Sequence, residues 1–519
     1  MSFIPSDLSQ GTPPWQVARD ATYLRVLAFT TGQAALSTGL TLLVGLPIAF
    51  ALGRFRFPTQ RLWRALAVVP FVMPTVVTAA AFSALLGPRG AVNQALQAVL
   101  GVSQPPIQLQ GTLTLVLIAH VFYNVAVVVR IVGGFWAAFN PRVEEAAASL
   151  GATPWQTVRH VTLPLALPAI GAACALTFLF TFTSFGVMLL LGGARFATLE
   201  VEIYRQTAQL LRLDVATSLA LLQLLVTATV SWLAGQLERR AAVPLESQTV
   251  RFAGRAPETW AARLLVLGSV VVVLLLLGAP MFALAARSLG EADNPLRFYL
   301  ALGQNTRNAF FFVPPLSAVR NSLMFALAAA LICIGLGLPL AYAMARDAGF
   351  SRVMEGILLL PIGASAVTLG LGYVVAFSAP PLNLRTSPLL VPVAHALIAL
   401  PFVVRSVLPA LRALDTRLRE AAQSLGAGPL AALRHVDLPL LSAPFGSAAV
   451  FAFTISIGEF GASLLIARPE FPTMTTAIFR FLGQPGEMNY GQALAMSTIL
   501  MLVTLVSALL IEWLNERWR

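Results

Sequence analysis

Long apolar segments recur along the whole chain and restrict it to one class of fold. The 519 residues are 57% hydrophobic and only 11% charged, which is far more apolar than a soluble globular protein. A run of 20 or more apolar residues suits a helix that crosses a bilayer, where every backbone polar group must be satisfied internally. The sequence therefore predicts an all-α polytopic membrane protein.

About eleven transmembrane helices are expected, five in the first half of the chain and six in the second. They lie near 29–52, 64–86, 112–136, 165–191, 215–236, 263–286, 319–343, 354–378, 387–409, 442–466 and 492–513. The predicted domains are an N-terminal segment (1–28), a first transmembrane domain (29–236), a cytoplasmic linker (237–262), a second transmembrane domain (263–513) and a cytoplasmic tail (514–519).

The basic residues predict the topology. All 34 are arginines, and they concentrate at the ends of the apolar runs, so the net charge of +12 indicates a positive-inside membrane protein and not a nucleic-acid binder. The loop with Arg54 and Arg56, the linker, the loop with Arg346 and the tail are expected inside, and the N-terminus outside. Because a P-loop needs a lysine on the phosphates, the chain is not a P-loop ATPase.

A polar, helix-prone motif occurs twice between the apolar runs. The first copy is Glu144-Glu145-Ala146-Ala147-Ala148-Ser149-Leu150-Gly151 and the second is Glu420-Ala421-Ala422-Gln423-Ser424-Leu425-Gly426; Leu163-Pro164 returns as Leu438-Pro439, and matching residues are 275 positions apart. Upstream, Gly45-Leu46-Pro47 matches Gly337-Leu338-Pro339 at an offset of 292; the outer loop 87–111 mainly absorbs the difference. A five-helix core is therefore duplicated as a tandem parallel repeat, with a pathway expected at the interface.

Each copy of the motif predicts two short helices. Asn140 and Asp415 suit N-caps, and Gly151 and Gly426 suit the left-handed residue after a helix. A second short helix is expected to begin after each glycine and to end before the Leu-Pro pair.

The doubled motif resembles the signature loop of type I ABC importer permeases: Glu-Ala-Ala, three residues, Gly, nine residues, an aliphatic residue, one residue and Leu-Pro. Two such domains fused in one chain resemble the permeases of ferric iron and thiamine importers. The resemblance implies that the following residues contact ATPase subunits: Glu144, Glu145, Ala146, Ala147, Gly151, Pro164, Glu420, Ala421, Ala422, Gly426 and Pro439.

The same resemblance implies the partners and the location. Two cytoplasmic ATPase subunits would bind ATP and Mg, an extracytoplasmic solute-binding protein would deliver the substrate, and this chain would be a transport subunit with no enzyme activity and no cofactor of its own. It would lie in the lipid bilayer of a bacterial cytoplasmic (inner) membrane and work by alternating access. The expected substrate is ferric iron or thiamine.

Candidate pathway residues lie in one pair of matching helices. Glu459 stands well inside an apolar run, where an acid faces a cavity or a partner by default, and its repeat partner is Ser184. Phe185 and Phe460, beside them, form either a constriction or a helix contact. His120 and His395 favour an interhelical hydrogen bond in each half over a metal site. Cys174 and Cys333 are expected to be core residues and not a disulfide.

Other functions remain open at this stage. An ion-coupled secondary transporter would have several intramembrane acids and would leave the doubled loop unexplained. Gly458-Glu459-Phe460-Gly461 also resembles permeases for oxyanions such as molybdate, so an oxyanion or phosphonate importer of the same class is a further alternative.

Overall fold

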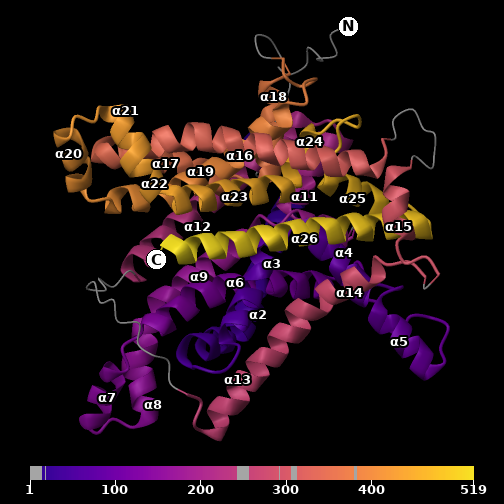
Figure 1. Cartoon of the computed structure of the whole chain (residues 1–519). Helices are drawn as coiled ribbons and strands as arrows, with labels where there is room; N and C mark the ends of the chain where they lie inside the picture. Colours follow the sequence, from indigo (N-terminus) through magenta and orange to yellow (C-terminus); the bar gives the residue numbers. More distant parts are fainter. Residues whose placement is uncertain are drawn as a thin grey trace. The chain divides into compact units, whose positions relative to one another are not determined.

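The computed structural model shows a largely helical chain (Figure 1). It describes residues 14–17, 19–193, 195–241, 256–291, 293–304, 313–378 and 383–518. Residues 1–13 of the predicted N-terminal segment and 242–255 of the predicted linker lie outside the described residues. The chain divides into two compact units: unit 1 extends to Phe71 and continues over Thr78–Arg287, and unit 2 contains Val72–Val77 and the residues from Ser288 onward.

Unit 1 is built around the long helices α2, α6, α9 and α12, which pack against one another. Its helices, including π-helical segments labelled η, are α1 (Pro14–Val17), α2 (Ala21–Arg54), α3 (Gln60–Val72), α4 (Thr75–Leu86), α5 (Ala91–Leu100), α6 (Leu113–Ala138), α7 (Arg142–Ser149), α8 (Pro154–Thr157), η2 (Val158–Thr162), α9 (Leu163–Phe182), α10 (Gly186–Leu191), α11 (Leu199–Tyr204), η3 (Arg205–Gln209), α12 (Leu213–Ala241), α13 (Trp260–Val273), η4 (Leu274–Gly278) and α14 (Ala279–Arg287).

Unit 2 is built in the same way around α16, α19, α23 and α26. Its helices are α15 (Arg297–Leu300), the 3₁₀ turn η5 (Ala301–Gly303), α16 (Pro315–Arg346), α17 (Ala348–Gly363), α18 (Ala366–Ala376), α19 (Leu390–Ala413), α20 (Thr416–Ser424), α21 (Pro429–Ala432), η6 (Leu433–Asp437), α22 (Leu438–Leu440), α23 (Ser442–Gly458), α24 (Gly461–Ile466), α25 (Met474–Leu482) and α26 (Glu487–Trp518).

The first helices of the second half belong to unit 1. Helix α13 packs against α2, and the boundary between the units follows α14, at Arg287. The sequence places the start of the second transmembrane domain at residue 263, so the compact units divide the chain later than the sequence pattern does.

The helix count is close to the prediction. In the described residues, nine helices are long and apolar enough to cross a membrane, and a tenth is formed by a pair, Leu433–Leu440 and Ser442–Gly458, bent by 65°. The predicted span 354–378 is not continuous, because it ends as α17 at Gly363 and restarts as α18 after Ser365, whose Oγ accepts the N–H of Thr368 at 3.0 Å. A proline inside α17, Pro361, removes one backbone donor just before this break.

The repeat predicted from the sequence is visible in individual contacts. The Thr30 hydroxyl accepts the N–H of Leu199 at 3.0 Å, and Ser322, its repeat partner, accepts the N–H of Met474 at 2.6 Å. Close helix approach is repeated as well: a Cβ on Gly45 would meet Val128 at 2.9 Å, and a Cβ on Gly337 would meet Val403 at 3.0 Å. The duplicated core therefore folds twice to the same local design.

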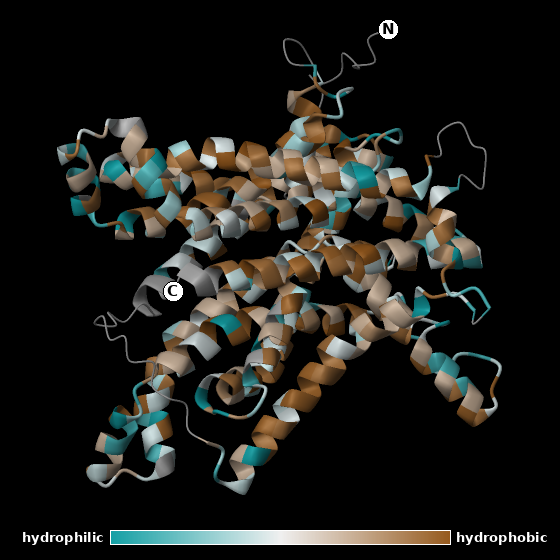
Figure 2. Cartoon of the chain, viewed as in Figure 1, coloured by the Kyte–Doolittle hydropathy of each residue, from teal (hydrophilic) through white to brown (hydrophobic). Residues whose placement is uncertain are grey.

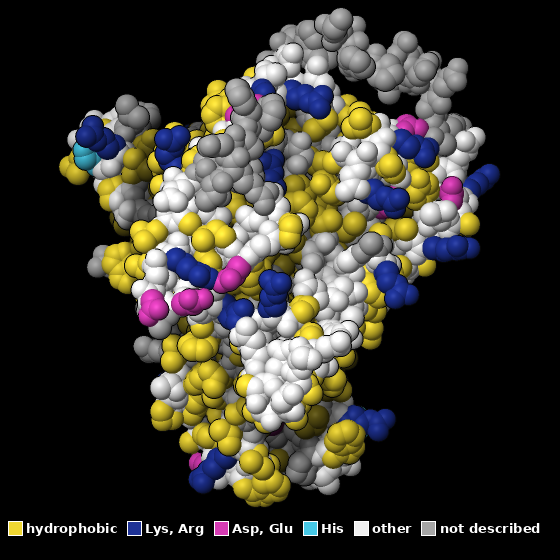
Figure 3. Space-filling model, turned by 90° about the vertical axis from the view of Figure 1, so that its right-hand side faces the viewer, with side chains coloured by type: hydrophobic (Ala, Val, Ile, Leu, Met, Phe, Trp, Pro, Cys, Tyr) yellow, Lys and Arg dark blue, Asp and Glu magenta, His cyan; other side chains and the backbone are white. Residues whose placement is uncertain are grey.

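Apolar side chains cover the long helices on their outer faces. Figure 2 shows hydrophobic residues along these helices and more hydrophilic ones at α7 and α20, and Figure 3 shows hydrophobic side chains over much of the visible face. Leu43, Leu225 and Phe282 in unit 1 and Leu331 and Val506 in unit 2 are exposed. Such a surface suits lipid and not water, so the structure is that of a multi-pass membrane protein.

Candidate functional site

The doubled motif forms a pair of short helices in each unit, which we call coupling segments 1 (residues 140–164) and 2 (residues 415–439). Within unit 1, α7 and α8 lie at one end of the long helices, and within unit 2, α20 and α21 do the same (Figure 1). The cap predicted at Asp415 forms, whereas the residue directly before α7 is Pro141 and Asn140 lies one position further upstream. Asn140 Oδ1 accepts the N–H of Arg142 at 3.0 Å, and Asp415 Oδ1 accepts that of Arg417 at 3.0 Å.

Each first helix ends in a Schellman motif around the predicted glycine. Gly151 has φ +83° and Gly426 φ +85°. In segment 1 the N–H of Gly151 bonds to Ala148 O at 2.9 Å, and the N–H of Ala152 bonds to Ala147 O at 3.1 Å. Segment 2 repeats both bonds. A Cβ on either glycine would meet open space, so only the left-handed backbone requires glycine.

The second short helix does not end before the Leu-Pro pair, contrary to the prediction. Helix α8 widens into the π-helical turn η2 and continues as α9, so that Pro164 lies inside a continuous helix. In segment 2, Pro439 lies in α22, and the chain bends only after it. A π-helical turn before each proline changes the backbone hydrogen-bond pattern where the proline lacks an N–H.

The coupling segments present mostly exposed side chains. Glu145, Ala146, Gly151 and Pro164 are exposed, as are Glu420, Ala421, Gly426 and Pro439, whereas Ala147 and Ala422 are half-buried. A leucine stands at the tip of each segment, Leu150 with 89% and Leu425 with 90% of its surface exposed.

Glu144, in contrast, turns toward its own unit. Its carboxylate forms an ion pair with Arg54 at the end of α2, and its Oε1 accepts the hydroxyl of Thr162 at 3.0 Å. The Arg54 guanidinium also lies over the Phe139 ring, 5.3 Å from its centroid. We call Arg54, Glu144 and Thr162 clasp 1.

Unit 2 contains a corresponding group with the charges reversed. Arg419, the repeat partner of Glu144, donates from Nε to Asp437 Oδ1 at 2.8 Å, and Tyr342 donates its hydroxyl to Asp437 Oδ2 at 3.0 Å. Asp437 is the repeat partner of Thr162. The hydrogen bond to Asp437 raises the pKa of the Arg419 guanidinium, which therefore stays charged. We call Arg419, Asp437 and Tyr342 clasp 2.

The candidate pathway residues lie where two long helices are interrupted. Helix α9 ends before Ser184 and Phe185, and helix α23 ends before Glu459 and Phe460. All four residues are buried within their own units. Phe185 packs on Tyr204 of α11, with 5.5 Å between ring centroids, and Phe460 packs on Phe479 of α25 at the same distance, so each ring contacts the second helix after its break.

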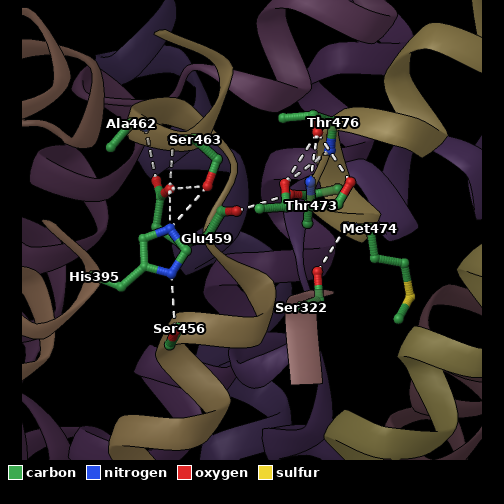
Figure 4. Close-up of polar contacts among 10 residues, drawn as sticks. Ser322, His395, Ser456, Glu459, Ala462, Ser463, Thr473, Met474 and Thr476 are labelled. Carbon is green, nitrogen blue, oxygen red and sulfur yellow. Dashed lines mark hydrogen bonds and ion pairs between the residues drawn. The ribbon is translucent and has the colours of Figure 1, made fainter. Parts of the chain in front are cut away.

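Glu459 is hydrogen-bonded by both carboxylate oxygens (Figure 4). Its Oε1 accepts the N–H of Ala462 at 3.0 Å, and its Oε2 accepts the N–H of Ser463 at 2.9 Å and its hydroxyl at 3.0 Å. His395 Nε2 lies 3.4 Å from Oε2. The carboxylate thus caps the start of α24, and this geometry favours a role in holding the helix break.

The two histidines make the interhelical hydrogen bonds predicted for them. His395 lies 2.8 Å from Ser456 on α23 and 2.8 Å from Ser463 on α24. His120 lies 3.0 Å from Ser37 on α2 and 2.9 Å from Ser184. Each histidine therefore joins the helix that carries it to the helix break of its own unit.

Two further buried acids escaped the sequence interpretation. Glu200 and Glu202 lie in the short helix α11; the Gln223 side chain donates to Glu200, and the Gln206 side chain donates to Glu202 Oε1 at 2.6 Å. Their positions outside the longest apolar runs concealed their burial. At the repeat offset Glu200 aligns with Thr475, which is also buried, but the sequence itself carries no signal of burial at either position.

Comparisons with known proteins agree with this architecture. The chain is 26% identical to the thiamine transport system permease protein ThiP of Salmonella typhimurium, over 99% of this chain and 94% of that protein. It is 27% identical to ThiP of Escherichia coli, over 90% and 85%. It is also 34% identical to the molybdenum transport system permease protein ModB of Azotobacter vinelandii, over 35% of this chain and 79% of ModB.

Two segments, residues 45–243 and 334–519, match the family described as the binding-protein-dependent transport system inner membrane component. Together these segments cover most of the chain and include both coupling segments, both clasps and both helix breaks. The ion-coupled secondary transporter is thereby excluded. This chain belongs to the binding-protein-dependent inner membrane components, and it is a permease subunit of an ABC importer that carries the family's domain twice.

Proposed function

We propose that this chain forms the membrane pathway of a thiamine importer. The observation that carries the proposal is the similarity to two thiamine permeases across both repeats, over 99% and 90% of this chain. We divide the chain as the sequence predicts, into permease domains 29–236 and 263–513 joined by a cytoplasmic linker at 237–262.

We place one ATPase subunit on each coupling segment. Glu145 and Glu420 are exposed on the first helix of each segment, and Leu150 and Leu425 stand fully outward at its end. An apolar tip ringed by polar groups fits a cleft on a soluble protein. Because the two segments have the same backbone geometry, we expect two copies of one ATPase subunit, and these partners would bind ATP and Mg.

The pathway is proposed to run beside the helix breaks that contain Ser184-Phe185 and Glu459-Phe460. Interrupted helices are typical of transport sites, because they place backbone ends and bends near the middle of the membrane. The two breaks lie in repeat-related helices, so movement of each repeat would carry one break with it. An extracytoplasmic solute-binding protein would deliver thiamine, and alternating access would follow from rocking of the repeats.

The test is ATP hydrolysis by the chain reconstituted with its ATPase subunits. We expect stimulation by a thiamine-loaded binding protein, and thiamine uptake into vesicles that depends on ATP. Ferric-iron-loaded binding protein serves as the control. Failure of any ATPase to co-purify with the unaltered chain would overturn the partner assignment, whereas stimulation by iron alone would overturn the substrate.

Glu145→Arg and Glu420→Arg test the docking surface. Each change reverses a charge on an exposed face without touching either clasp, so we expect weaker co-purification of the ATPase with an otherwise stable chain. Retention of the ATPase and normal uptake in both variants would remove the coupling segments from the interface.

A second candidate substrate is an oxyanion. The similarity to ModB, a molybdenum permease, is higher in identity but covers only one domain. A molybdate-loaded binding protein in the same assay distinguishes the two, since each substrate would require its own binding protein.

A further inference from the structure

Each coupling segment is fastened to its own unit by a clasp, and the two clasps share one design. In clasp 1 the side chains of Glu144 and Thr162 meet across 18 residues, and in clasp 2 those of Arg419 and Asp437 meet across the same 18 residues. A third side chain comes from the preceding long helix: Arg54 from α2 and Tyr342 from α16. Both clasps therefore join three elements.

In each clasp, both oxygens of the central carboxylate have a hydrogen-bond or ion-pair partner. Glu144 has one oxygen on Arg54 and the other on Thr162, and Asp437 has one oxygen on Arg419 and the other on Tyr342. Asp437 is almost completely buried, with 5% of its side chain exposed, and Arg54 retains 13%. Partial burial and two occupied oxygens separate these groups from ordinary surface ion pairs, which contribute little.

The polarity is opposite in the two units. The first short helix of the coupling segment supplies the acid in clasp 1 and the cation in clasp 2, whereas the π-helical turn that follows supplies a hydroxyl in clasp 1 and the acid in clasp 2. Arg346, the repeat partner of Arg54, is exposed. Two of the three positions, 144/419 and 162/437, thus correspond between the clasps, whereas the third side chain comes from different positions on α2 and α16.

We infer that the two clasps are positioning groups that hold each coupling segment rigidly on its own helix bundle, so that movement imposed on the segment reaches the transmembrane helices. The part of this inference that concerns ATP-driven movement rests on the proposed function. The part that concerns rigidity does not. Glu144, Arg54 and Thr162 serve in unit 1, and Arg419, Asp437 and Tyr342 serve in unit 2.

The reversed polarity supplies a rescue experiment. Glu144→Arg places a cation beside Arg54 and breaks clasp 1, and adding Thr162→Asp supplies an acid to the new cation, as Asp437 does for Arg419 in clasp 2. Reciprocally, Arg419→Glu places two acids together and breaks clasp 2. Adding Asp437→Thr rebuilds it in the form of clasp 1, with Arg346 as the available cation.

Rigidity is measured on the full chain in lipid nanodiscs, without partners. We expect the rate of amide hydrogen exchange to rise about tenfold in α7 of Glu144→Arg and in α20 of Arg419→Glu. In the double variants the rate should return toward that of the unaltered chain, because the paired residues act through one contact network. Arg417→Glu, an exposed charge reversal on α20 outside the clasp, is the control. Unchanged exchange in both single variants, or double variants no better than the singles, would overturn the inference.

Force transmission is measured as thiamine transported per ATP hydrolysed in the reconstituted complex. We expect both single variants to retain their ATPase subunits and to transport less thiamine per ATP, and the rescued variants to recover. Loss of ATPase binding in the single variants would show that the clasps serve docking and would contradict the assigned role. If the unaltered chain binds no ATPase, the proposed function fails. The exchange experiment still tests whether the clasps hold the coupling segments rigidly on their own units.

Discussion

Glu459 is a buried acid whose surroundings explain why it can be there. An ionised carboxylate inside a membrane protein is expensive unless it is hydrogen-bonded or paired. Here two backbone N–H groups, the Ser463 hydroxyl and His395 surround it. The repeat partner Ser184 contacts His120 through a single hydroxyl. At this position of the helix break, the histidine of the unit therefore contacts an acid in unit 2 and a hydroxyl in unit 1.

Glu459→Ala should destabilise unit 2. The change leaves the N–H groups of Ala462 and Ser463 without their carboxylate partner, at a cost of about 1–3 kcal/mol. The measurement is thermal unfolding of the purified chain in detergent. Glu459→Ser is the matched control, because a serine at a cap position still accepts a backbone N–H, and it should lose less stability. Equal stability of Glu459→Ala and the unaltered chain would contradict the capping role.

Gly151→Ala and Gly426→Ala should distort the tips of the coupling segments. An alanine held at positive φ costs about 1–2 kcal/mol, although it meets no neighbouring atom. We expect weaker binding of the ATPase subunit, measured by titration of the reconstituted chain. Asparagine tolerates this conformation better, so Gly151→Asn and Gly426→Asn should bind more tightly than the alanine variants. Tighter ATPase binding by the alanine variants than by the asparagine variants would show that side-chain size, and not backbone conformation, determines the binding.

At the level of side chains, the sequence predicts local contacts better than distant ones. The Asp415 cap and the glycine stops follow from rules that involve neighbouring residues, and the histidine contacts follow from their place in matching helices. Arg54 and Glu144 are 90 residues apart, and the repeat conceals their pairing because the corresponding residues, Arg346 and Arg419, are both cations. The offset of 275 aligns Glu144 with Arg419, which looks like a lost residue and not like a conserved contact.

Among the helices, α5 distinguishes the two repeats. It lies in the loop that lengthens the first repeat, and within unit 1 it lies at the end opposite α7 (Figure 1). Asn93 is fully buried and organises this loop, because its side chain donates to Gly87 O and Ile107 O and accepts the N–H of Ile107, each at 2.8 Å. The loop is therefore a folded element and not a loose connection.

Asn93→Ala should loosen this element. Three hydrogen bonds are lost, and the half-buried backbone groups of Ile107 are left without Asn93 as a partner, so local opening should become easier by about 1–3 kcal/mol. We expect faster cleavage of the loop by an added protease in sealed vesicles. Gln97→Ala removes one exposed hydrogen bond, to Ser103 O, and should change little. Similar cleavage rates for both variants would contradict the organising role of Asn93.

The limits of prediction at the level of helices come from backbone geometry. Hydropathy finds most spans, since each needs only length and apolar composition. It does not show that 354–378 is two helices, nor that α8 continues through η2 into α9. A proline usually ends a helix, but in the coupling segments the π-helical turns η2 and η6 carry the helix past Pro164 and Pro439.

For the whole chain, the arginine distribution and the duplicated fold predict a single orientation. Both coupling segments and the C-terminus should be cytoplasmic, and α5 extracytoplasmic. A reporter fused after Arg519 should therefore read out cytoplasm, and a reporter inserted after Gln104 should read out the opposite side. The insertion site is exposed and close to the tip of the α5 loop, so it should disturb the fold little. Signals on the same side of the membrane would overturn the predicted topology.

The opposite polarity of the two clasps also bears on how the two halves of the gene can exchange sequence. A crossover between the codons for the two clasp positions would join Glu144 to an aspartate, or Arg419 to a threonine. The first product sets two carboxylates against each other, and the second leaves a guanidinium without its acid. Recombinants of this kind are expected to be selected against, so the codons for positions 144 and 162 should be inherited together, as should those for positions 419 and 437.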